Sequence, residues 1–424
     1  MENSETSDLL KGKIFKILFL LLLVRLGLYI PVPNVDLNIF SQNQIANSTF
    51  GFAKNLTGSS FLGVGSLGII PYINASIIIQ LLTSVVPSLE RLQKEEGEYG
   101  RQQITRYTRY LTFVWALVLS SGVALFLVKP VVFDWSLLLA CKVILSLTTG
   151  SILSMWFAEL ITEEGLGNGS SMLIFINIVG GIPNSFKNVN QFVLNGSSYF
   201  SSLVTLSQIL FSYFFIVLVI VIFQYSYKKV DIVSAKQLNL SYSSSDQQLS
   251  ELKNSYIPLK LNQGGIMPLV FSSTIVVFLS YPLQLLLSSD LGTNFPFLST
   301  AVTTLSVSLN FVLVVFFSCF YALLVLKPED ISQNLAKMAY SVPGVRQGKQ
   351  TTKYLEKLVS RLAFMGGLFL AFLAFFPLIL GNLLQSNLFR NTTSLLILIG
   401  VITDVTSQIR GYLVSRRYEG FRRP

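Results

Sequence analysis

The sequence predicts an all-α polytopic membrane protein, and three observations support that fold class. First, the 424-residue chain is 51% hydrophobic and only 12% charged, with a mean hydropathy of +0.60. Second, apolar stretches about as long as a bilayer is thick recur along the whole chain. Third, lysine and arginine collect in alternate connecting segments, as in a chain that threads back and forth through a membrane.

Ten apolar stretches are candidate membrane spans. They cover residues 14–30, 68–86, 109–128, 137–160, 171–183, 203–224, 265–285, 301–326, 361–380 and 392–411. The fifth is short and ends with Gly180, Gly181 and Pro183. No small-residue cleavage site follows the first stretch, so we expect it to be retained as a span rather than removed as a signal peptide.

The distribution of positive charge predicts the topology. With the N-terminus placed inside, twenty-five of the 31 lysines and arginines fall in inside segments, and both termini lie inside. The inside segments 225–262 and 327–360 are longer than orientation requires. They either set orientation alone or form a docking platform for an acidic or phosphate-rich partner, such as ribosomal RNA or an acidic motor protein. The outside segments hold only Lys54, Lys129, Lys187 and Arg390.

The second stretch is unusual for a helix that faces lipid. It is opened by Gly68 and Pro71 and carries the polar residues Asn74 and Gln80, which lipid does not favour. The preceding segment, residues 55–67, is too short to span the membrane and too apolar for an exterior loop. A half-helix that dips back into the membrane, buried in protein, is the allowed interpretation.

The opening of this helix recurs later in the chain. Gly68-Ile69-Ile70-Pro71 is matched by Gly265-Ile266-Met267-Pro268, and each Gly-Ile is followed four residues after the Ile by an apolar residue, Ile73 or Val270. Corresponding Gly/Pro-broken helices in two halves of a membrane protein indicate a central pathway.

Composition argues against an enzyme and against a metal or other cofactor. The chain has no histidine and only two cysteines, Cys141 and Cys319, each inside an apolar run. Residues 165–169, which are rich in glycine, precede an apolar span and predict a helix-entry turn rather than a nucleotide-binding loop. No pair of acids suits an intramembrane aspartyl protease. The candidates for buried ionisable groups are Arg25, Lys142, Glu159 and Asp404.

Secondary transport of a small solute is the alternative function. Transporters also use broken helices and internal repeats, but they bind solutes through convergent polar groups near the middle of the membrane. This chain offers mainly Ile, Val, Leu and Asn there. A path lined by apolar residues can seal against ions by dewetting, which suits a large and chemically varied passenger better.

Several motifs, in the same order along the chain, resemble those of the SecY family, the central subunits of the Sec protein-conducting channel. The resemblance runs from the first span to Tyr418-Glu419-Gly420. The motifs that carry it are Gly68–Leu82, Gly97–Tyr110, Thr162–Gly169, Pro258–Pro268 and Val342–Thr351.

The resemblance implies a clamshell of ten helices around a central pore, closed from outside by a re-entrant plug. It implies an N-terminal half, residues 1–224, and a C-terminal half, residues 225–424, as inverted five-helix repeats, with the sixth helix opening the second set near residue 203. The function implied is translocation of unfolded polypeptides and sideways release of apolar segments into lipid.

The resemblance also assigns roles by motif position. The pore ring is expected at Ile69, Ile73, Ile174, Val270 and Ile397. The lateral gate, between the second and seventh helices, is expected to include Asn74, Gln80, Asn262 and Phe278. The plug is expected at about 56–66, with Leu56, Phe61, Leu62 and Val64. Partner docking is expected at Arg346, Lys349 and Lys236.

Two departures from the family pattern accompany these expectations. Ser170 stands where relatives often have another ring isoleucine, and residues 238–254 lack the paired arginines that many relatives carry in this docking loop. The expected partners are SecE-like and SecG-like small subunits, the SecA motor ATPase, the ribosome, polypeptides with signal sequences, and membrane lipid. The composition and motifs indicate a plastid thylakoid membrane, with a bacterial plasma membrane as the alternative.

Overall fold

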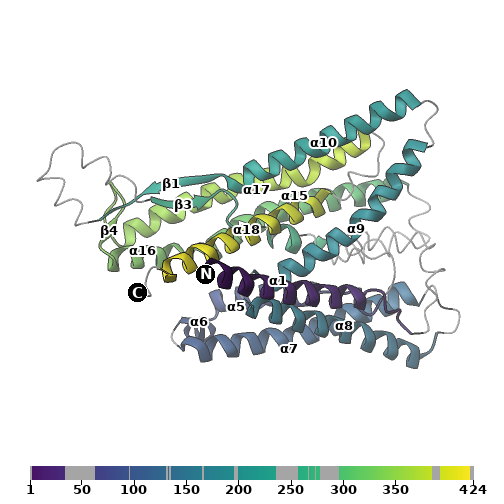
Figure 1. Ribbon diagram of the computed structural model, residues 1–424, viewed down its shortest axis with the longest axis horizontal. Coiled ribbons are helices and arrows are strands. Elements are labelled where there is room, and N and C mark those ends of the chain that lie inside the picture. Colours follow the sequence, from purple (N-terminus) through teal and green to yellow (C-terminus); the bar gives the residue numbers. More distant parts are fainter. Residues whose placement is uncertain are drawn as a thin grey trace, which may run out of the picture. The chain divides into compact units, whose positions relative to one another are not determined.

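The computed structural model is helical almost throughout (Figure 1). It describes residues 2–33, 63–94, 96–129, 132, 135–164, 167–194, 199–234, 256–265, 267–272, 274–276, 296–383 and 392–420. The helices are α1 (Glu2–Gly27), α5 (Ile70–Val85), α6 (Pro87–Lys94), α7 (Gly97–Val123), the π-helix η1 (Ala124–Val128), α8 (Leu137–Glu163), α9 (Gly169–Leu194), α10 (Tyr199–Tyr225), α15 (Pro296–Leu326), α16 (Pro328–Lys337), α17 (Lys349–Leu383) and α18 (Thr392–Gly420). The strands are β1 (Tyr227–Asp231), β2 (Val233–Ser234), β3 (Tyr256–Lys260) and β4 (Tyr340–Ser341). A further short apolar helix covers Met267–Val276.

A helix lies at each of the ten predicted stretches, but several boundaries differ. Within the described ranges, three helices are long and apolar enough to cross a membrane, or four if α5 and α6 count as one span bent by 105°. The number ten therefore stays a prediction. The fifth stretch is part of a longer helix than its apolar residues cover, because α9 continues past Pro183 to Leu194. Membrane helices tolerate proline and glycine when neighbouring groups satisfy the backbone.

The chain divides into two compact units. The first unit comprises Met1–Leu203 with Ile397–Pro424, and the second comprises Val204–Leu396. The first turn of α18 belongs to the second unit, and the rest of that helix belongs to the first.

In the first unit, α7 packs between α5 and α8, and α1 packs against α8 and α9. One hydrophobic cluster joins Val123 and Val128 at the end of α7 and η1 to Leu139 and Leu147 of α8. Several buried residues of α7 are small: Thr112, Ala116 and Ser120 are fully buried, and the Ser120 hydroxyl lies 3.0 Å from the Thr148 hydroxyl of α8. Small side chains let two helices approach closely, which is the usual packing mode in a membrane.

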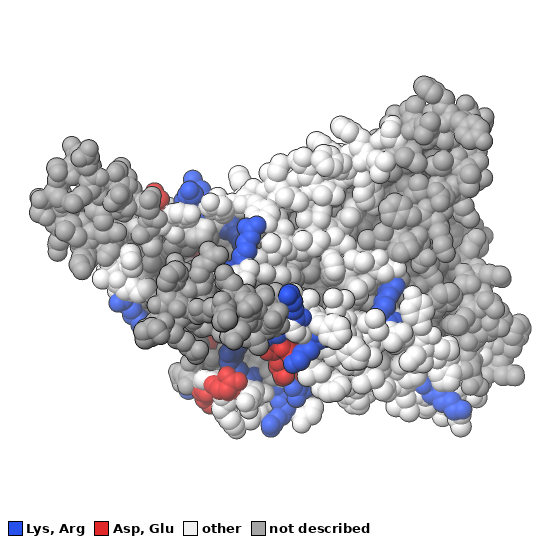
Figure 2. All heavy atoms as spheres, in the orientation of Figure 1, with Lys and Arg blue, Asp and Glu red and all other residues white. Residues whose placement is uncertain are grey.

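The outward surface of the first unit is apolar. Phe15 on α1 is 73% exposed and Leu137 on α8 is 83% exposed, with further large hydrophobic side chains along both helices. In Figure 2 the acidic atoms lie near the end where Figure 1 shows α6, and the rest of the light surface carries only a few basic side chains. A continuous apolar surface of this extent requires lipid or a protein partner as its environment.

The second unit joins a helical layer to a small sheet region. The long helices α15 and α17 pack along each other, and Phe223 of α10 stacks on Phe369 of α17 at 4.5 Å. Strand β1 pairs antiparallel with β3, Tyr227 opposite Lys260, and β2 pairs with β4. Val230, Leu259, Val342 and Val359, with neighbouring side chains, bury the strands against the ends of α15 and α17.

Candidate functional site

The turn that precedes α5 is hydrogen-bonded to the C-terminal end of α1 and the residues that follow it. Gly63 bridges to Pro31, the Val64 amide donates to the Ile30 carbonyl (2.9 Å), and the Gly65 amide donates to the Gly27 carbonyl (3.1 Å). Gly68 then adopts φ +51°, and α5 begins two residues later. The left-handed backbone at Gly68 explains a glycine here, because a side chain would be strained.

Four of the five predicted ring residues lie in the first unit, and each is buried. Ile69 and Ile73 lie one turn apart at the start of α5, Ile174 lies on α9 and Ile397 on α18, and their exposed fractions are between 1% and 3%. The fifth, Val270, lies in the second unit and is 1% exposed. All five supply apolar surface near helix ends or within helices and carry no group that could bind an ion.

Two asparagines in the first unit have unsatisfied amide groups. Asn74, next to Ile73 on α5, is 2% exposed, and neither its oxygen nor its nitrogen has a hydrogen-bond partner within the described part of the chain. The side-chain oxygen of Asn177 on α9 is also buried without a partner. An unpaired buried amide typically costs about 1–3 kcal/mol. Sequence reasoning singled out Asn74 but missed Asn177, whose only signal is its place in an apolar span.

The second broken helix begins at a turn organised by Asn262. The Asn262 side chain is buried and donates to the Gly265 carbonyl (3.0 Å), and Gly265 has φ +59°. After this turn, Phe271 packs edge-on against Phe317 of α15, with 4.5 Å between ring centroids. Asn262 therefore shapes the entry to this helix. The predicted gate residue Phe278 lies outside the described residues, and Gln80 is half-buried on α5.

The start of α9 confirms the predicted helix-entry turn. The Asn168 side-chain oxygen accepts from the Ser170 amide (3.1 Å) and from the Ser170 hydroxyl (2.7 Å), and the Gly169 amide donates to the Thr162 hydroxyl (2.9 Å). Asparagine is a favoured helix N-cap for this reason. The Ser170 hydroxyl is thus engaged in the cap.

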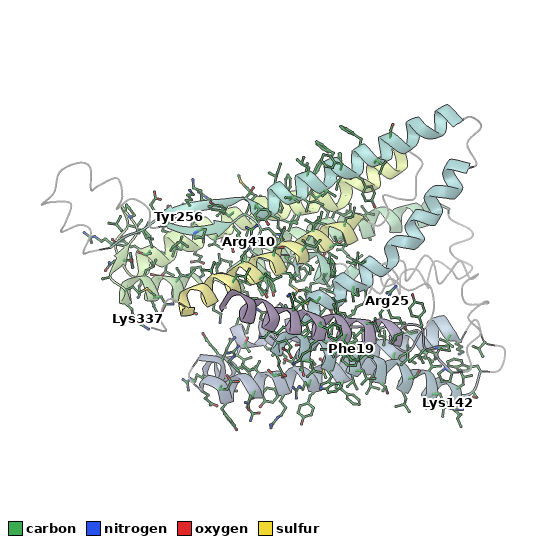
Figure 3. All side chains as sticks on the ribbon, viewed as in Figure 1. Phe19, Arg25, Lys142, Tyr256, Lys337 and Arg410 are labelled. Atoms are coloured by element: carbon green, nitrogen blue, oxygen red, sulfur yellow. The ribbon has the colours of Figure 1, made fainter. Side chains whose placement is uncertain are left out.

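The ionisable residues singled out in the spans have different environments. Glu159 of α8 forms an ion pair with Arg109 of α7, with contacts of 2.9 and 3.1 Å. Arg25 of α1 lies where that helix passes α9, and a Cβ on Gly180 would collide with its guanidinium (Figure 3). Lys142 is exposed and Asp404 is half-buried.

The C-terminal end of α8 is held by α1. The Lys13 ammonium donates to the main-chain oxygen of Glu164 (2.8 Å), just past the last residue of α8, and Lys16 pairs with the Glu164 carboxylate at 3.2 Å. A cation at a helix C-terminus complements the helix dipole.

Of the plug residues, only Val64 lies within the described ranges; Leu56, Phe61 and Leu62 do not. Val64 lies in a turn, and its carbonyl packs so closely on Gly150 of α8 that a Cβ there would collide with it. This contact anchors the C-terminal end of the predicted plug segment to the first unit.

The predicted docking residues Arg346 and Lys349 are exposed at the turn between β4 and α17. The predicted turn at Pro343-Gly344 is confirmed, since the Val345 amide donates to the Val342 carbonyl (3.1 Å). The Thr351 hydroxyl donates to the Arg346 carbonyl (2.8 Å), which fixes the backbone. Lys236 lies outside the described residues. Within the described chain, no three His, Cys, Asp or Glu side chains are placed to hold a metal ion.

Comparison with solved structures defines the class of protein. The fold matches "The structure of a protein conducting channel" with a TM-score of 0.59, covering 93% of this chain and 90% of that one at 14% identity. It also matches Sec61 in a canine ribosome-channel complex from the endoplasmic reticulum, with a TM-score of 0.55, 93% and 90% coverage and 14% identity. The fold is that of protein-conducting channels.

The chain belongs to the SecY family. The SecY family model matches residues 64–406. Protein translocase subunit SecY of Emiliania huxleyi is 67% identical over the full length of both chains, and that of Guillardia theta is 44% identical over 97% of this chain and 96% of its own. The SecY of a Synechocystis strain is 39% identical over 97% and 94%. The resemblance inferred from the motifs is confirmed, and the chain is a channel subunit of a protein translocase rather than an enzyme.

Proposed function

We propose that this chain forms the central pore of a Sec channel, which passes unfolded polypeptides across a plastid membrane and releases apolar segments sideways into lipid. The observation that carries the proposal is the pair of helices that begin after Gly68 and Gly265, each with a buried apolar residue, Ile73 or Val270, within its first turns. These two helices belong to different units of a SecY-family chain.

The pore ring would consist of Ile69, Ile73, Ile174, Val270 and Ile397. Apolar side chains hold no inorganic ion, and a narrow apolar constriction blocks ions by excluding water. The same side chains make no hydrogen bonds, so the ring would not select among passing polypeptides by their sequence. The burial of these five side chains supports this role.

The lateral gate would include Asn74, Gln80, Asn262 and Phe278. A signal sequence gains more from lipid than from a watery pore, and a charged residue at mid-bilayer costs about 3 kcal/mol on insertion scales. A side opening can therefore sort segments by transfer free energy alone. The unpaired amide of Asn74 supports this role, because it disfavours the closed packing of α5 and makes opening easier.

The remaining architecture follows the same proposal. We infer ten spans in two inverted halves, residues 1–224 and 225–424, with a plug that includes Leu56, Phe61, Leu62 and Val64. The contact of the Val64 carbonyl with Gly150 of α8 supports an attachment of the plug to the first unit at its C-terminal end.

Partner binding would use the exposed residues Arg346 and Lys349, together with Lys236, on the inside. Their chemistry fits the SecA motor ATPase or ribosomal RNA, and SecE-like and SecG-like subunits would cover apolar surface. Two of the solved structures with this fold, canine Sec61 and the yeast Ssh1 complex, are bound to ribosomes. The similarity to algal SecY proteins supports a plastid membrane, and we place the chain in the thylakoid.

Site-specific photocrosslinking tests the channel function. A probe at Ile73 would be compared with one at Val118, which is 47% exposed on α7, during arrest of a secretory precursor that bears a signal sequence. We expect a crosslink from Ile73 alone. Equal crosslinking from both positions, or none in a correctly inserted complex, contradicts the ring. Saturable uptake of a small solute without polypeptide would instead indicate a transporter.

A further inference from the structure

The outer end of α8 presents a cation on an apolar face. Leu138 and Leu145 are 64% and 63% exposed, and Lys142 is exposed between them. Residues at positions i, i+4 and i+7 share one face of a helix. Lys142 projects from this face at the end of α8 far from α6 (Figure 3). An ammonium group on a surface that faces lipid needs water or an anion within its reach.

The depth of Lys142 in the membrane follows from the length of α8. The opposite, inner end is marked by the Arg109–Glu159 ion pair and by Lys13 on the Glu164 carbonyl. Lys142 precedes Glu159 by 17 residues, which is about 25 Å along a helix. The hydrocarbon core is about 30 Å thick. The flexible side chain therefore reaches the outer headgroup layer.

A second cation and a tryptophan lie at the same end of this helix pair. Lys129 follows η1 and is exposed, and its neighbour Val128 belongs to the same hydrophobic cluster as Leu139 of α8. Trp135 packs against that cluster, and tryptophan is enriched where a membrane meets water. Neither lysine counts toward the inside charge bias, since Lys129 lies in a predicted outside segment and Lys142 lies near the outer end of its predicted span.

We propose that the outer end of α8 binds the headgroup of an anionic membrane lipid. Lys142 contacts the headgroup, the acyl chains lie along Leu138 and Leu145, and Lys129 adds positive charge at the same end of the helix pair. The positive charge of Lys142 favours an anionic ligand. Its depth in the membrane and the exposed leucines beside it, Leu138 and Leu145, favour a lipid over a soluble anion. The site is distinct from the proposed pore and gate and does not depend on them.

Lipid retention measured by native mass spectrometry tests the site. The full chain with its small subunits would be purified from vesicles that contain phosphatidylcholine with a minor share of phosphatidylglycerol. We expect preferential retention of phosphatidylglycerol, and we expect Lys142→Gln to reduce it roughly fivefold, the factor for one cation near an anionic surface. Lys142→Arg should retain the lipid, and Lys337→Gln, at an exposed lysine on α16, should leave retention unchanged.

Three results would overturn the proposal. Retention unchanged in Lys142→Gln, with unaltered thermal unfolding, would show that the lysine does not bind lipid. Competition by inorganic phosphate at millimolar concentration would indicate a site for a soluble anion. Retention that rises only when the small subunits are removed would indicate that a partner helix covers this face.

Discussion

Gly68 and Gly265 adopt the same left-handed backbone, with φ of +51° and +59°, each two residues before a helix whose second residue is proline. Proline fits the first turn of a helix, because its missing N–H has no partner there in any case. The four-residue match seen in the sequence is thus also a match in backbone geometry, at one position in each unit. The shared backbone geometry supports an internal repeat more strongly than the four-residue sequence match does by itself.

Replacing either glycine with alanine should destabilise the protein. A non-glycine residue in this conformation costs roughly 1–2 kcal/mol, so Gly68→Ala and Gly265→Ala should each lower the melting temperature in thermal unfolding. Gly122→Ala is the matched control, because a Cβ at this position in α7 meets nothing within 4 Å. It should be neutral or slightly stabilising. Equal behaviour of Gly68→Ala and Gly122→Ala would show that the left-handed backbone is not required.

The two ends of the Arg109–Glu159 pair should respond unequally to substitution. The Glu159 side chain is 11% exposed and that of Arg109 is 52% exposed. Arg109→Gln leaves a largely buried carboxylate unpaired and should cost about 2 kcal/mol, whereas Glu159→Gln leaves the guanidinium half in water and should cost about 1 kcal/mol or less. The double variant should be more stable than Arg109→Gln alone. Equal costs for the two single variants in equilibrium unfolding would contradict this asymmetry.

The interface between α7 and α8 should depend on side-chain size more than on hydrogen bonding. Ser120 and Thr148 lie 3.0 Å apart between hydroxyl oxygens, and the Thr148 hydroxyl also bonds to the Ile144 carbonyl. Ser120→Ala should therefore cost only about 0.6 kcal/mol. Ala116→Leu should cost about 1–3 kcal/mol, because the site is fully buried. Val118→Leu, on the exposed face, serves as the control, and a cost equal to that of Ala116→Leu would refute close packing.

Gly180 should be coupled energetically to Arg25. A Cβ at residue 180 would occupy the position of the Arg25 guanidinium, so Gly180→Ala should destabilise the protein by about 1–3 kcal/mol through overpacking. In a double-mutant cycle with Arg25→Met, the cost of Gly180→Ala should largely disappear. Gly12→Ala in α1, where nothing lies within 4 Å, should show no coupling.

The sequence predicted what depends on hydropathy and local turn chemistry. Helix positions, the helix-entry turn before α9 and the turn at Pro343-Gly344 follow from residue types within a few positions of each other. Burial of Ile73, Ile174 and Ile397 agrees with residues chosen by motif position, although the ring itself stays a prediction.

Other features depend on long-range pairing and could not be predicted. The pairing of Tyr227 with Lys260 joins the ends of a long connection, and hydropathy carries no information on such register. The 105° bend between α5 and α6 occurs at Val86, the predicted last residue of the second span, and hydropathy gives no sign that a second helix follows at that angle. Helix α17 begins at Lys349, twelve residues before the predicted span, because its polar first turns pack on α16 outside any apolar stretch.

The hydrogen bond from Lys13 to the Glu164 main-chain oxygen affects which substitutions the two positions tolerate. A carbonyl acceptor is present whatever side chain occupies position 164, so a mutation there keeps this link between α1 and α8 intact. The Lys16–Glu164 ion pair is largely exposed and contributes little. Substitutions at residue 164 should therefore accumulate without compensating changes at residue 13, and the two positions should show no covariation although they touch.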